Sequence, residues 1–218
     1  MKVAIHILAA SMLGICAHAA SAADAVPAGT YTLDRAHASL IFRVNHMGFS
    51  NYTARFRHFD AQLSFDPAQL ARSSVTVTVD ARSLETDFPD PAKIDFNAML
   101  QNDQWLDTAK YPEMTWRSTQ VEMTGANRMR ITGALTLHGL TRPVTLDATY
   151  NGGYPGFAMD PHARIGFSAH GTLKRSDFGI AYGIPAPGSN MGVGDDVQLQ
   201  IEAEFSGPDW KGAPAAHP

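Results

Sequence analysis

Cysteine is almost missing from this sequence of 218 residues, and its scarcity narrows the chemistry. The only cysteine is Cys16, inside an apolar N-terminal segment. One cysteine cannot form an internal disulfide, and no thiol nucleophile or thiolate metal ligand exists after position 16. The fold must therefore rest on a hydrophobic core, which the ~195 residues that follow the N-terminal segment are enough to bury as one domain.

The spacings of common catalytic and metal sites are also missing. No two histidines stand as H-x-H or H-x-x-x-H, and no G-x-S-x-G elbow surrounds a serine. Residues 177–179 spell the D-F-G of protein kinases, but the Gly-rich and H-R-D loops that must accompany it are absent. Ser168 is expected to face solvent, and Asp95 and Asp103 are expected on a solvated helix surface. We predict no catalytic residue, no metal and no required cofactor.

Long hydrophobic runs are absent except at the N-terminus. Lys2 precedes an apolar run from Val3 to Cys16, and Ala20-Ser21-Ala22 offers the small-x-small pattern of a signal peptidase site. The run is shorter than the ~20 apolar residues of a membrane span, and Ile15 stands where a lipidated cysteine requires a small residue. Residues 1–22 are predicted to be a secretory signal peptide, residues 23–210 one domain, and residues 211–218 a disordered tail.

Charged residues are sparse, at 17% of the chain, and acidic residues outnumber basic ones. The formal net charge is −4, and removal of the leader with its Lys2 makes it one unit more negative. This balance argues against nucleic acid and against anionic membranes as partners.

Alternation of apolar and polar residues is what the sequence has in abundance, and it indicates strands with one buried face. The apolar faces recur at residues 40–44, 75–79, 131–137, 144–150, 165–173 and 199–205, less regularly at 56–65, and briefly at 121–123. Turn signals separate them at 46–48, 66–67, 124–127, 138–143 and 151–153. One helix is predicted over residues 91–106, with Pro91 in its first turn.

Many antiparallel strands and one helix predict an all-β fold, either a closed barrel or a sandwich. We expect an eight-stranded antiparallel barrel with one short helical segment, which is wide enough for one small ligand. The face opposite the apolar one carries charged and amide side chains such as Arg43, Asn45 and Glu202. That chemistry favours water outside the barrel over the lipid contact of an outer-membrane barrel.

Large apolar residues on these faces either fill a core or line a cavity. At about 0.8 kcal/mol per buried methylene, such a cavity would hold a hydrocarbon tail. The positions expected to face it are Phe42, Val44, Phe56, Leu63, Trp105, Trp116, Leu135, Leu137, Ile165 and Phe167. His46 continues the face of Phe42 and Val44, and Arg175 follows the end of a strand. Both are expected near a ligand headgroup.

Residues 174–180, KRSDFGI, are predicted to form a corner of the barrel. Phe178 is expected to plug the apolar interior, and Gly179 to permit the bend into the loop that follows. Arg175 is expected to pair with Asp177. The Gly/Pro-rich stretch 183–194 is the longest predicted loop, with no assigned role.

Several of these stretches, in this order, resemble the YceI-like family of bacterial, mostly periplasmic proteins. They are YTLD at 31–34, HAS at 37–39, FRVNHMG at 42–48, FRHFD at 56–60, FDP at 65–67, the segment 100–112, GALTLHGLTRPV at 133–144, and 174–180. The resemblance implies an elongated, lipocalin-like antiparallel barrel around a tunnel. It also implies polyisoprenoid, isoprenoid quinone or other lipid ligands, with no bound metal needed. Ala54 and Ala61 depart from the glycines of many members, and the loop 185–193 looks longer than usual.

Three functions stay open from the sequence. The first is a periplasmic carrier that holds a long apolar lipid, either a polyisoprenoid or an isoprenoid quinone, inside the barrel. The second is a structural or stress-related interaction module with a packed barrel. The third is an enzyme acting on an isoprenoid lipid, which would need a polar cluster among the inward positions, where only His46 is expected. A homodimer is compatible with each of them.

Overall fold

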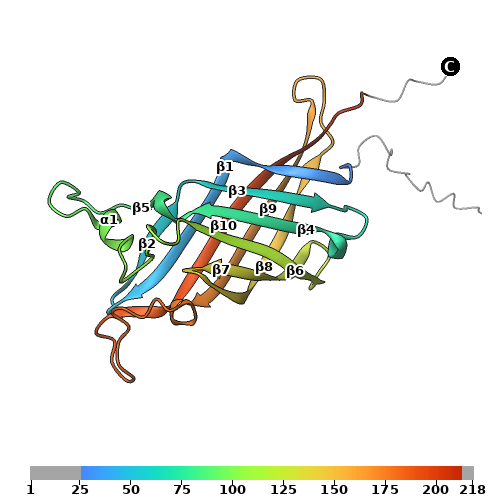
Figure 1. Cartoon of the computed structure of the whole chain (residues 1–218). Coiled ribbons are helices and arrows are strands. Elements are labelled where there is room, and N and C mark those ends of the chain that lie inside the picture. Colours follow the sequence, from blue (N-terminus) through green and yellow to red (C-terminus); the bar gives the residue numbers. More distant parts are fainter. Residues whose placement is uncertain (1–25, 213–218) are drawn as a thin grey trace, which may run out of the picture.

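The protein is described by a computed structural model over residues 26–212 (Figure 1). The predicted signal peptide and residues 213–218 of the predicted tail lie outside the described residues. The strands are β1 (Gly29–His46), β2 (Ser50–Phe56), β3 (Phe59–Phe65), β4 (Ser74–Asp80), β5 (Leu84–Thr86), β6 (Glu113–Met123), β7 (Arg128–Leu137), β8 (Leu140–Tyr154), β9 (His162–Lys174) and β10 (Val193–Asp209). One helix, α1 (Phe96–Leu100), and the 3₁₀ turns η2 (Leu70–Arg72), η3 (Ala81–Ser83) and η4 (Arg175–Phe178) complete the described elements.

Eight strands close into an antiparallel barrel. Their order is β10-β9-β8-β7-β6-β4-β3-β1, and β1 pairs back with β10. This closed circuit confirms the predicted eight-stranded barrel and excludes the sandwich. The two remaining strands extend the wall at the end that carries α1, because β2 pairs with the second half of β1 and β5 pairs with β2 (Figure 1).

Strand β1 pairs with β10 along one edge and with two strands, β3 and β2, along the other. A bulge lies between these two pairings. Residues 29–32 pair with β3, and residues 40–46 pair with β2. The register against β10 shifts between Leu33 and Ala38. An extra stretch of this kind bends and twists a strand. The bend lies between the part of β1 that pairs with β3 and the part that pairs with β2.

The β7–β8 connection is a short antiparallel connection, as the turn signal at 138–143 predicts, but its turn has only two residues and β8 already begins at Leu140. Leu137 pairs with Leu140 across it, and the two residues between them have positive φ, 52° for His138 and 73° for Gly139. Positive φ at both positions is the geometry of the turn that matches strand twist. The His138 Nδ1 atom lies 3.0 Å from the Phe178 carbonyl oxygen, so this hairpin is tied to η4.

The helix predicted over residues 91–106 is wrong in extent, because only Phe96–Leu100 is α-helical. Asp95 is its N-cap, with a side-chain oxygen that accepts from the Ala98 amide at 2.9 Å, rather than a residue of the helix surface. Asn102 ends the regular pattern: its side chain accepts from the Gln104 amide at 2.9 Å, which forms a local turn. An Asn side chain that hydrogen-bonds to a nearby backbone amide in this way favours a turn over a helix, even where the spacing of apolar residues is helical.

Two strand predictions also need correction. The less regular segment 56–65 is not one strand, since β2 ends at Phe56 and β3 begins at Phe59. The turn predicted at 151–153 is a bulge inside β8, and its register against β9 shifts between Tyr150 and Gly152. A Cβ on Gly153 would stand 2.2 Å from the carbonyl oxygen of Arg164, so glycine here permits close approach of two strands instead of a chain reversal.

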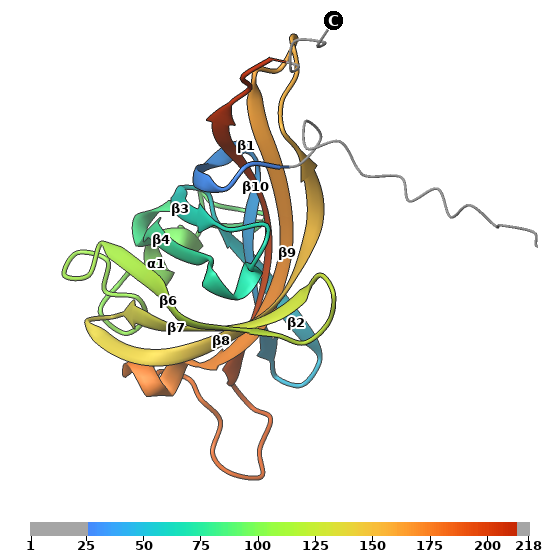
Figure 2. The same cartoon turned by 90° about the vertical axis from the view of Figure 1, so that its right-hand side faces the viewer.

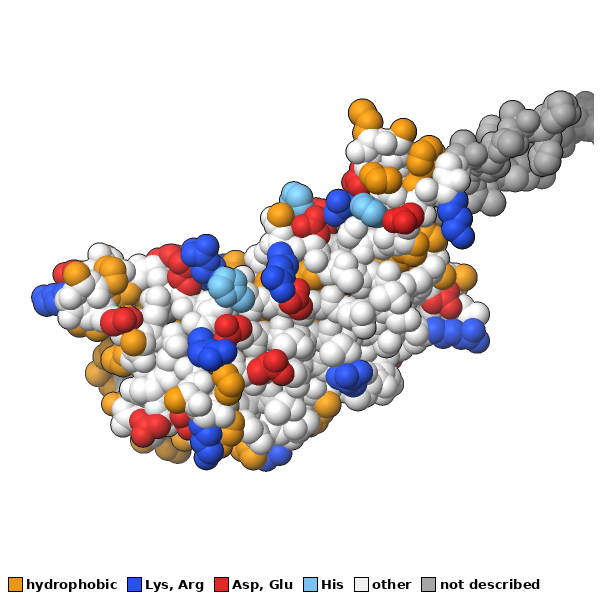
Figure 3. Space-filling model, turned by 45° about the horizontal axis from the view of Figure 1, so that its top comes forward, with side chains coloured by type: hydrophobic (Ala, Val, Ile, Leu, Met, Phe, Trp, Pro, Cys, Tyr) orange, Lys and Arg blue, Asp and Glu red, His pale blue; other side chains and the backbone are white. Residues whose placement is uncertain are grey.

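The alternating faces point as the sequence predicts, with apolar residues inside and polar residues outside. On the face shown in Figure 3, acidic and basic side chains are interspersed over the barrel wall. Within the described residues, no helix combines the length and apolar character needed to cross a bilayer.

Candidate ligand-binding cavity

The interior of the barrel is hollow. A larger chamber of about 590 Å³ and a smaller one of about 120 Å³ lie along it. Both chambers have five wall residues in common, which form the neck between them: Leu40, Val77, Trp116, Leu146 and Ile201. The larger volume lies within the range of about 300–1,000 Å³ that is usual for small-molecule sites.

The wall of the smaller chamber is almost wholly apolar. Leu63, Val75, Ile131 and Phe167 are among its residues, and apart from the Trp116 indole Ser73 and Ser74 are its only polar side chains in the described chain. Such a lining offers burial without directional contacts, so this chamber suits a hydrocarbon chain.

The larger chamber has a few polar groups in an apolar wall. Its polar lining residues in the described chain, apart from the two indoles, are His46, Tyr52, Thr115 and Arg175. The Tyr52 hydroxyl is buried and has no hydrogen-bond partner among the described residues. An unpaired buried hydroxyl costs about 1–3 kcal/mol, so a water or ligand group that pairs with it would be stabilised at this point.

Arg175 is a buried cation that anchors a loop. Its side chain is only 5% exposed and lies over the Trp105 ring, 5.2 Å from the centroid. Burial lowers the pKa of Arg175, and the Asp195 carboxylate opposes that effect. The guanidinium donates to four backbone carbonyls at 2.8–3.0 Å, those of Ile180, Tyr182, Val193 and Gly194. Arginine has five N–H donors, which leaves one for a ligand.

The corner formed by residues 174–180 agrees with the sequence prediction in two respects and contradicts it in one. Phe178 is 1% exposed in the core, and Gly179 has a φ of 76° after η4. The predicted Arg175–Asp177 pair is wrong, because the Arg175 side chain turns inward to the loop carbonyls. Asp195 braces the corner instead, accepting from the amide and the hydroxyl of Ser176 at 2.9 and 2.8 Å.

Trp116 shapes the neck. Its indole Nε1 donates to the carbonyl of Val144 at 3.3 Å. A Cβ on Gly133 would stand 2.3 Å from the indole ring, so only glycine at this position of β7 allows the ring to lie against the strand. The indole position therefore depends on this one residue of the neighbouring strand.

Eleven of the twelve predicted ligand-binding residues line the chambers. Facing the larger one are Phe42, Val44, His46, Phe56, Trp105, Trp116, Leu135, Leu137 and Arg175. Leu63 and Phe167 face the smaller one. Ile165 reaches neither chamber: it is 2% exposed and packs in the cluster of Tyr31, Phe65 and Phe205. Their contact with a ligand stays a prediction.

Sequence reasoning missed the cover of the larger chamber at the α1 end. Phe88, Phe96, Met99 and Leu106 line it there, together with Tyr52 on β2. The Phe96 ring lies 5.2 Å from Phe88 and 5.6 Å from Tyr52, measured between centroids. The segment from Phe88 to Leu106 has no strand alternation, so the sequence does not indicate which of its side chains face the chamber. Its cluster of aromatic residues was the available signal.

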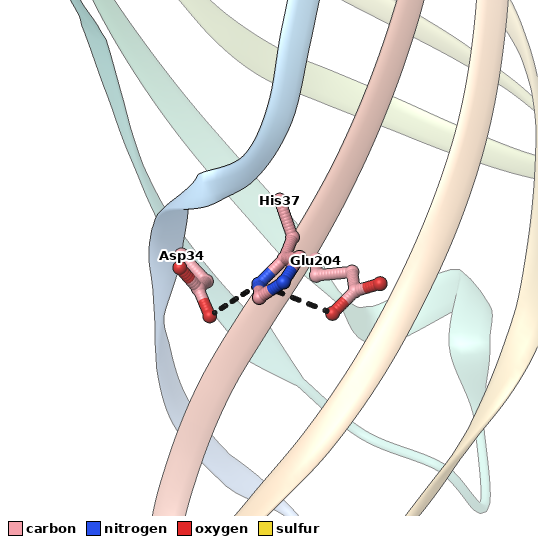
Figure 4. A group of neighbouring side chains, drawn as sticks. All are labelled: Asp34, His37 and Glu204. Atoms are coloured by element: carbon pink, nitrogen blue, oxygen red, sulfur yellow. Dashed lines mark hydrogen bonds and ion pairs between the residues drawn. The ribbon is translucent and has the colours of Figure 1, made fainter.

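A polar group on the outer wall joins Asp34, His37 and Glu204 (Figure 4). The His37 Nδ1 atom lies 3.1 Å from Asp34 Oδ2 and 3.9 Å from Glu204 Oε2. These donor types could hold a metal ion, but the Arg164 guanidinium already lies 2.7 Å from the same Asp34 oxygen. A fixed cation in that place favours an ion-pair network that ties the β1 bulge to β9 and β10.

This network predicts a pH-dependent stability. Hydrogen bonding to Asp34 and the charges of Asp34 and Glu204 raise the pKa of His37, and hydrogen bonding to His37 lowers the pKa of Asp34. The His37 contribution is complete below its unfolded pKa of about 6.5 and is lost as pH rises through the raised value. The Asp34 contribution is complete above about 3.9 and is lost as pH falls through the lowered value.

We therefore expect His37→Asn to lower the free energy of unfolding most between about pH 4 and 6.5, and progressively less above that range. Urea unfolding at pH 5.5 and pH 8.5 measures this difference. His170→Asn is the control, since His170 on β9 forms no ion pair among the described residues. Equal destabilisation by His37→Asn at both pH values would contradict the prediction.

The geometry described so far defines a closed antiparallel β-barrel protein with an apolar interior cavity. The sequence model of the YceI-like domain matches residues 31–205, which is most of the chain. The chain therefore belongs to the YceI-like family, as its motifs predicted.

Relatives and solved structures agree with this assignment. A UPF0312 protein of Vibrio cholerae is 36% identical over 190 residues, which cover 85% of this chain and 88% of that protein. BcnA of Burkholderia cenocepacia superposes with a TM-score of 0.65 at 25% identity, over 79% of this chain and 98% of BcnA. A polyisoprenoid binding domain from Saccharophagus degradans has a TM-score of 0.55 over 82% of this chain and 98% of that domain, but at 16% identity it shows the fold alone.

Proposed function

We propose that this protein is a periplasmic carrier that holds one long apolar lipid, a polyisoprenoid or an isoprenoid quinone, in its two chambers. The observation that carries the proposal is the apolar interior of two adjoining chambers, about 590 and 120 Å³, which share the residues of the neck. A packed interaction module would have filled this space. The predicted signal peptide supports the periplasmic location, and the polyisoprenoid binding domain with the same fold supports the ligand class.

The tail and the headgroup would be held in different ways. The neck and the smaller chamber contact a tail through burial alone, at about 0.8 kcal/mol per methylene, so they select for length and apolarity more than for identity. The headgroup would lie in the larger chamber, where Tyr52 has an unpaired hydroxyl and Arg175 a remaining donor. His46 and Thr115 are the other polar residues of that wall apart from the indoles. These hydrogen-bonding groups would give the headgroup its orientation.

Binding fits this wall better than catalysis. The described lining of the two chambers contains no carboxylate and no cysteine, and His46 is its only histidine. General acid–base chemistry usually needs two titratable groups with separated pKa values. We therefore propose a binding protein that needs no cofactor, with the bound lipid as its ligand.

The proposal predicts a lipid in the purified protein. After gentle purification, native mass spectrometry is expected to show the chain with one bound lipid, and delipidated protein is expected to take up a polyprenol or a prenylated quinone. The same spectrum reports whether a homodimer forms. Protein that is isolated without lipid and then takes up none of these compounds would show the proposal to be wrong.

A further inference from the structure

Two segments without any charged residue meet at one end of the barrel. Residues 44–54 and residues 178–194 contain no Lys, Arg, Asp or Glu, although such residues make up 17% of the chain. The first segment spans the β1–β2 turn, and the second is the loop from η4 to β10. We call residues 47–49 and 179–192 together the uncharged tip.

The two parts of the uncharged tip lie side by side. The Met47 amide donates to the Gly192 carbonyl at 2.8 Å, and the side chain of Asn190 packs against Gly48. Figures 1 and 2 both show the loop extending beyond the barrel wall next to the end of β1 and the start of β2. Within the loop, the Ser189 amide donates to the Ala186 carbonyl at 3.0 Å, so part of its backbone is hydrogen-bonded internally.

Apolar side chains project from this tip into solvent. Phe49 is 82% exposed, Met191 68% and Tyr182 52%. The residues at the base of the tip, by contrast, belong to the wall of the larger chamber: His46, Ile180 and Val193. The exposed apolar groups therefore stand at the chamber end where the few polar groups of its wall are found.

We propose that the uncharged tip docks on the surface of an electrically neutral lipid bilayer, with Phe49 and Met191 inserted at the interface. This inference rests on the proposed function. A long lipid that passes between a bilayer and the larger chamber would otherwise expose its tail to water on the way. Apposition of this end to the bilayer removes that exposure.

The composition of the tip fits a bilayer of that kind. Charged side chains are costly inside a bilayer, Tyr is favoured at its interface, and Phe is common on the buried face of segments that lie at the interface. The carboxylates of Asp177, Asp195 and Asp196 flank the tip at its base, where Lys174 forms ion pairs with the last two. This local charge offers no attraction for an anionic surface, so apolar insertion is the interaction that remains.

Flotation with vesicles made only of phosphatidylcholine tests the proposal. The double variant Phe49→Ser, Met191→Ser is expected to bind these vesicles about tenfold more weakly, or worse, because two inserted apolar side chains are lost. The control is Met159→Ser, since Met159 is 88% exposed and the β8–β9 connection that contains it lies at the other end of the barrel (Figure 1). Met159→Ser is expected to bind like the wild type.

Several results would overturn the docking proposal. Equal binding by the double variant and the control would do so, as would wild-type binding that requires anionic lipid and disappears with salt. Wild-type protein that does not bind vesicles at all would assign the tip to a protein partner instead. Uptake of polyprenol from detergent is measured separately, with native mass spectrometry as the detection method. If the wild type fails to take up polyprenol, the proposed function is wrong. If the double variant takes up polyprenol and still binds vesicles, the docking proposal alone is wrong.

Discussion

Val77→Trp is expected to weaken the binding of long lipids strongly while leaving the binding of short ones unchanged. Val77 lies on β4 in the neck, where it pairs with Trp116 on one side and Ala61 on the other. An indole at this position would close the passage between the chambers. A tail that loses one five-carbon unit of burial loses about 3–4 kcal/mol, which is on the order of a hundredfold or more in affinity.

The measurement is a titration of delipidated protein with prenols of increasing chain length. In the wild type, affinity is expected to rise with each unit until both chambers are filled. In Val77→Trp it is expected to stop rising at the length that fills the larger chamber. Overpacking can destabilise a core by about 1–3 kcal/mol, so thermal unfolding is measured in parallel.

Thr76→Trp is the matched control for this experiment. Thr76 lies on the same strand but faces outward, between Gln62 and Arg117 on the neighbouring strands. It adds the same side chain without entering a chamber, and long-lipid binding is expected to persist. If both tryptophan variants lose long and short lipids alike, the neck does not separate two parts of one ligand site.

The barrel was predictable because its strands obey one simple rule. Each of the eight barrel strands has an apolar face and a polar face, and the alternation of apolar and polar residues shows this directly in the sequence. Phe42 and Val44 line the chamber, for example, while Arg43 between them and Asn45 after them are exposed. What the rule could not show is local geometry such as the bulge at Gly152, because close approach of two strands depends on a partner far along the chain.

The candidate site was predictable mainly where it is built on strands. Tyr52 was missed although the signal was present, because Tyr52, Ala54 and Phe56 alternate with Asn51, Thr53 and Arg55 along β2. The aromatic cover at Phe88 and Phe96 was missed because it follows no period at all. Arg175 was placed at the chamber correctly, but its partners are backbone carbonyls up to 19 residues away, and no sequence pattern identifies a carbonyl as an acceptor.

The second large effect is expected from Arg175→Met, which keeps an apolar stem but removes every donor. Hydrogen bonds from charged groups contribute about 1.5–3 kcal/mol each, and four loop carbonyls would lose theirs. Water can reach some of these carbonyls, so we expect the free energy of unfolding to fall by about 3 kcal/mol or more. Arg175→Lys is expected to recover only part of this loss, because an ammonium group cannot span four acceptors as a planar guanidinium does.

Denaturant unfolding measures the loss, and hydrogen exchange locates it. Amides of residues 179–193 are expected to lose protection in Arg175→Met, while those of β6 and β7 keep theirs. Lys174→Met is the control, since among the described residues its exposed ammonium forms ion pairs with Asp195 and Asp196 alone. A stable Arg175→Met protein with a protected loop but without bound lipid would contradict the anchoring role. Arg175 would then act chiefly as a headgroup contact, because the remaining donor would matter more than the four that hold the loop.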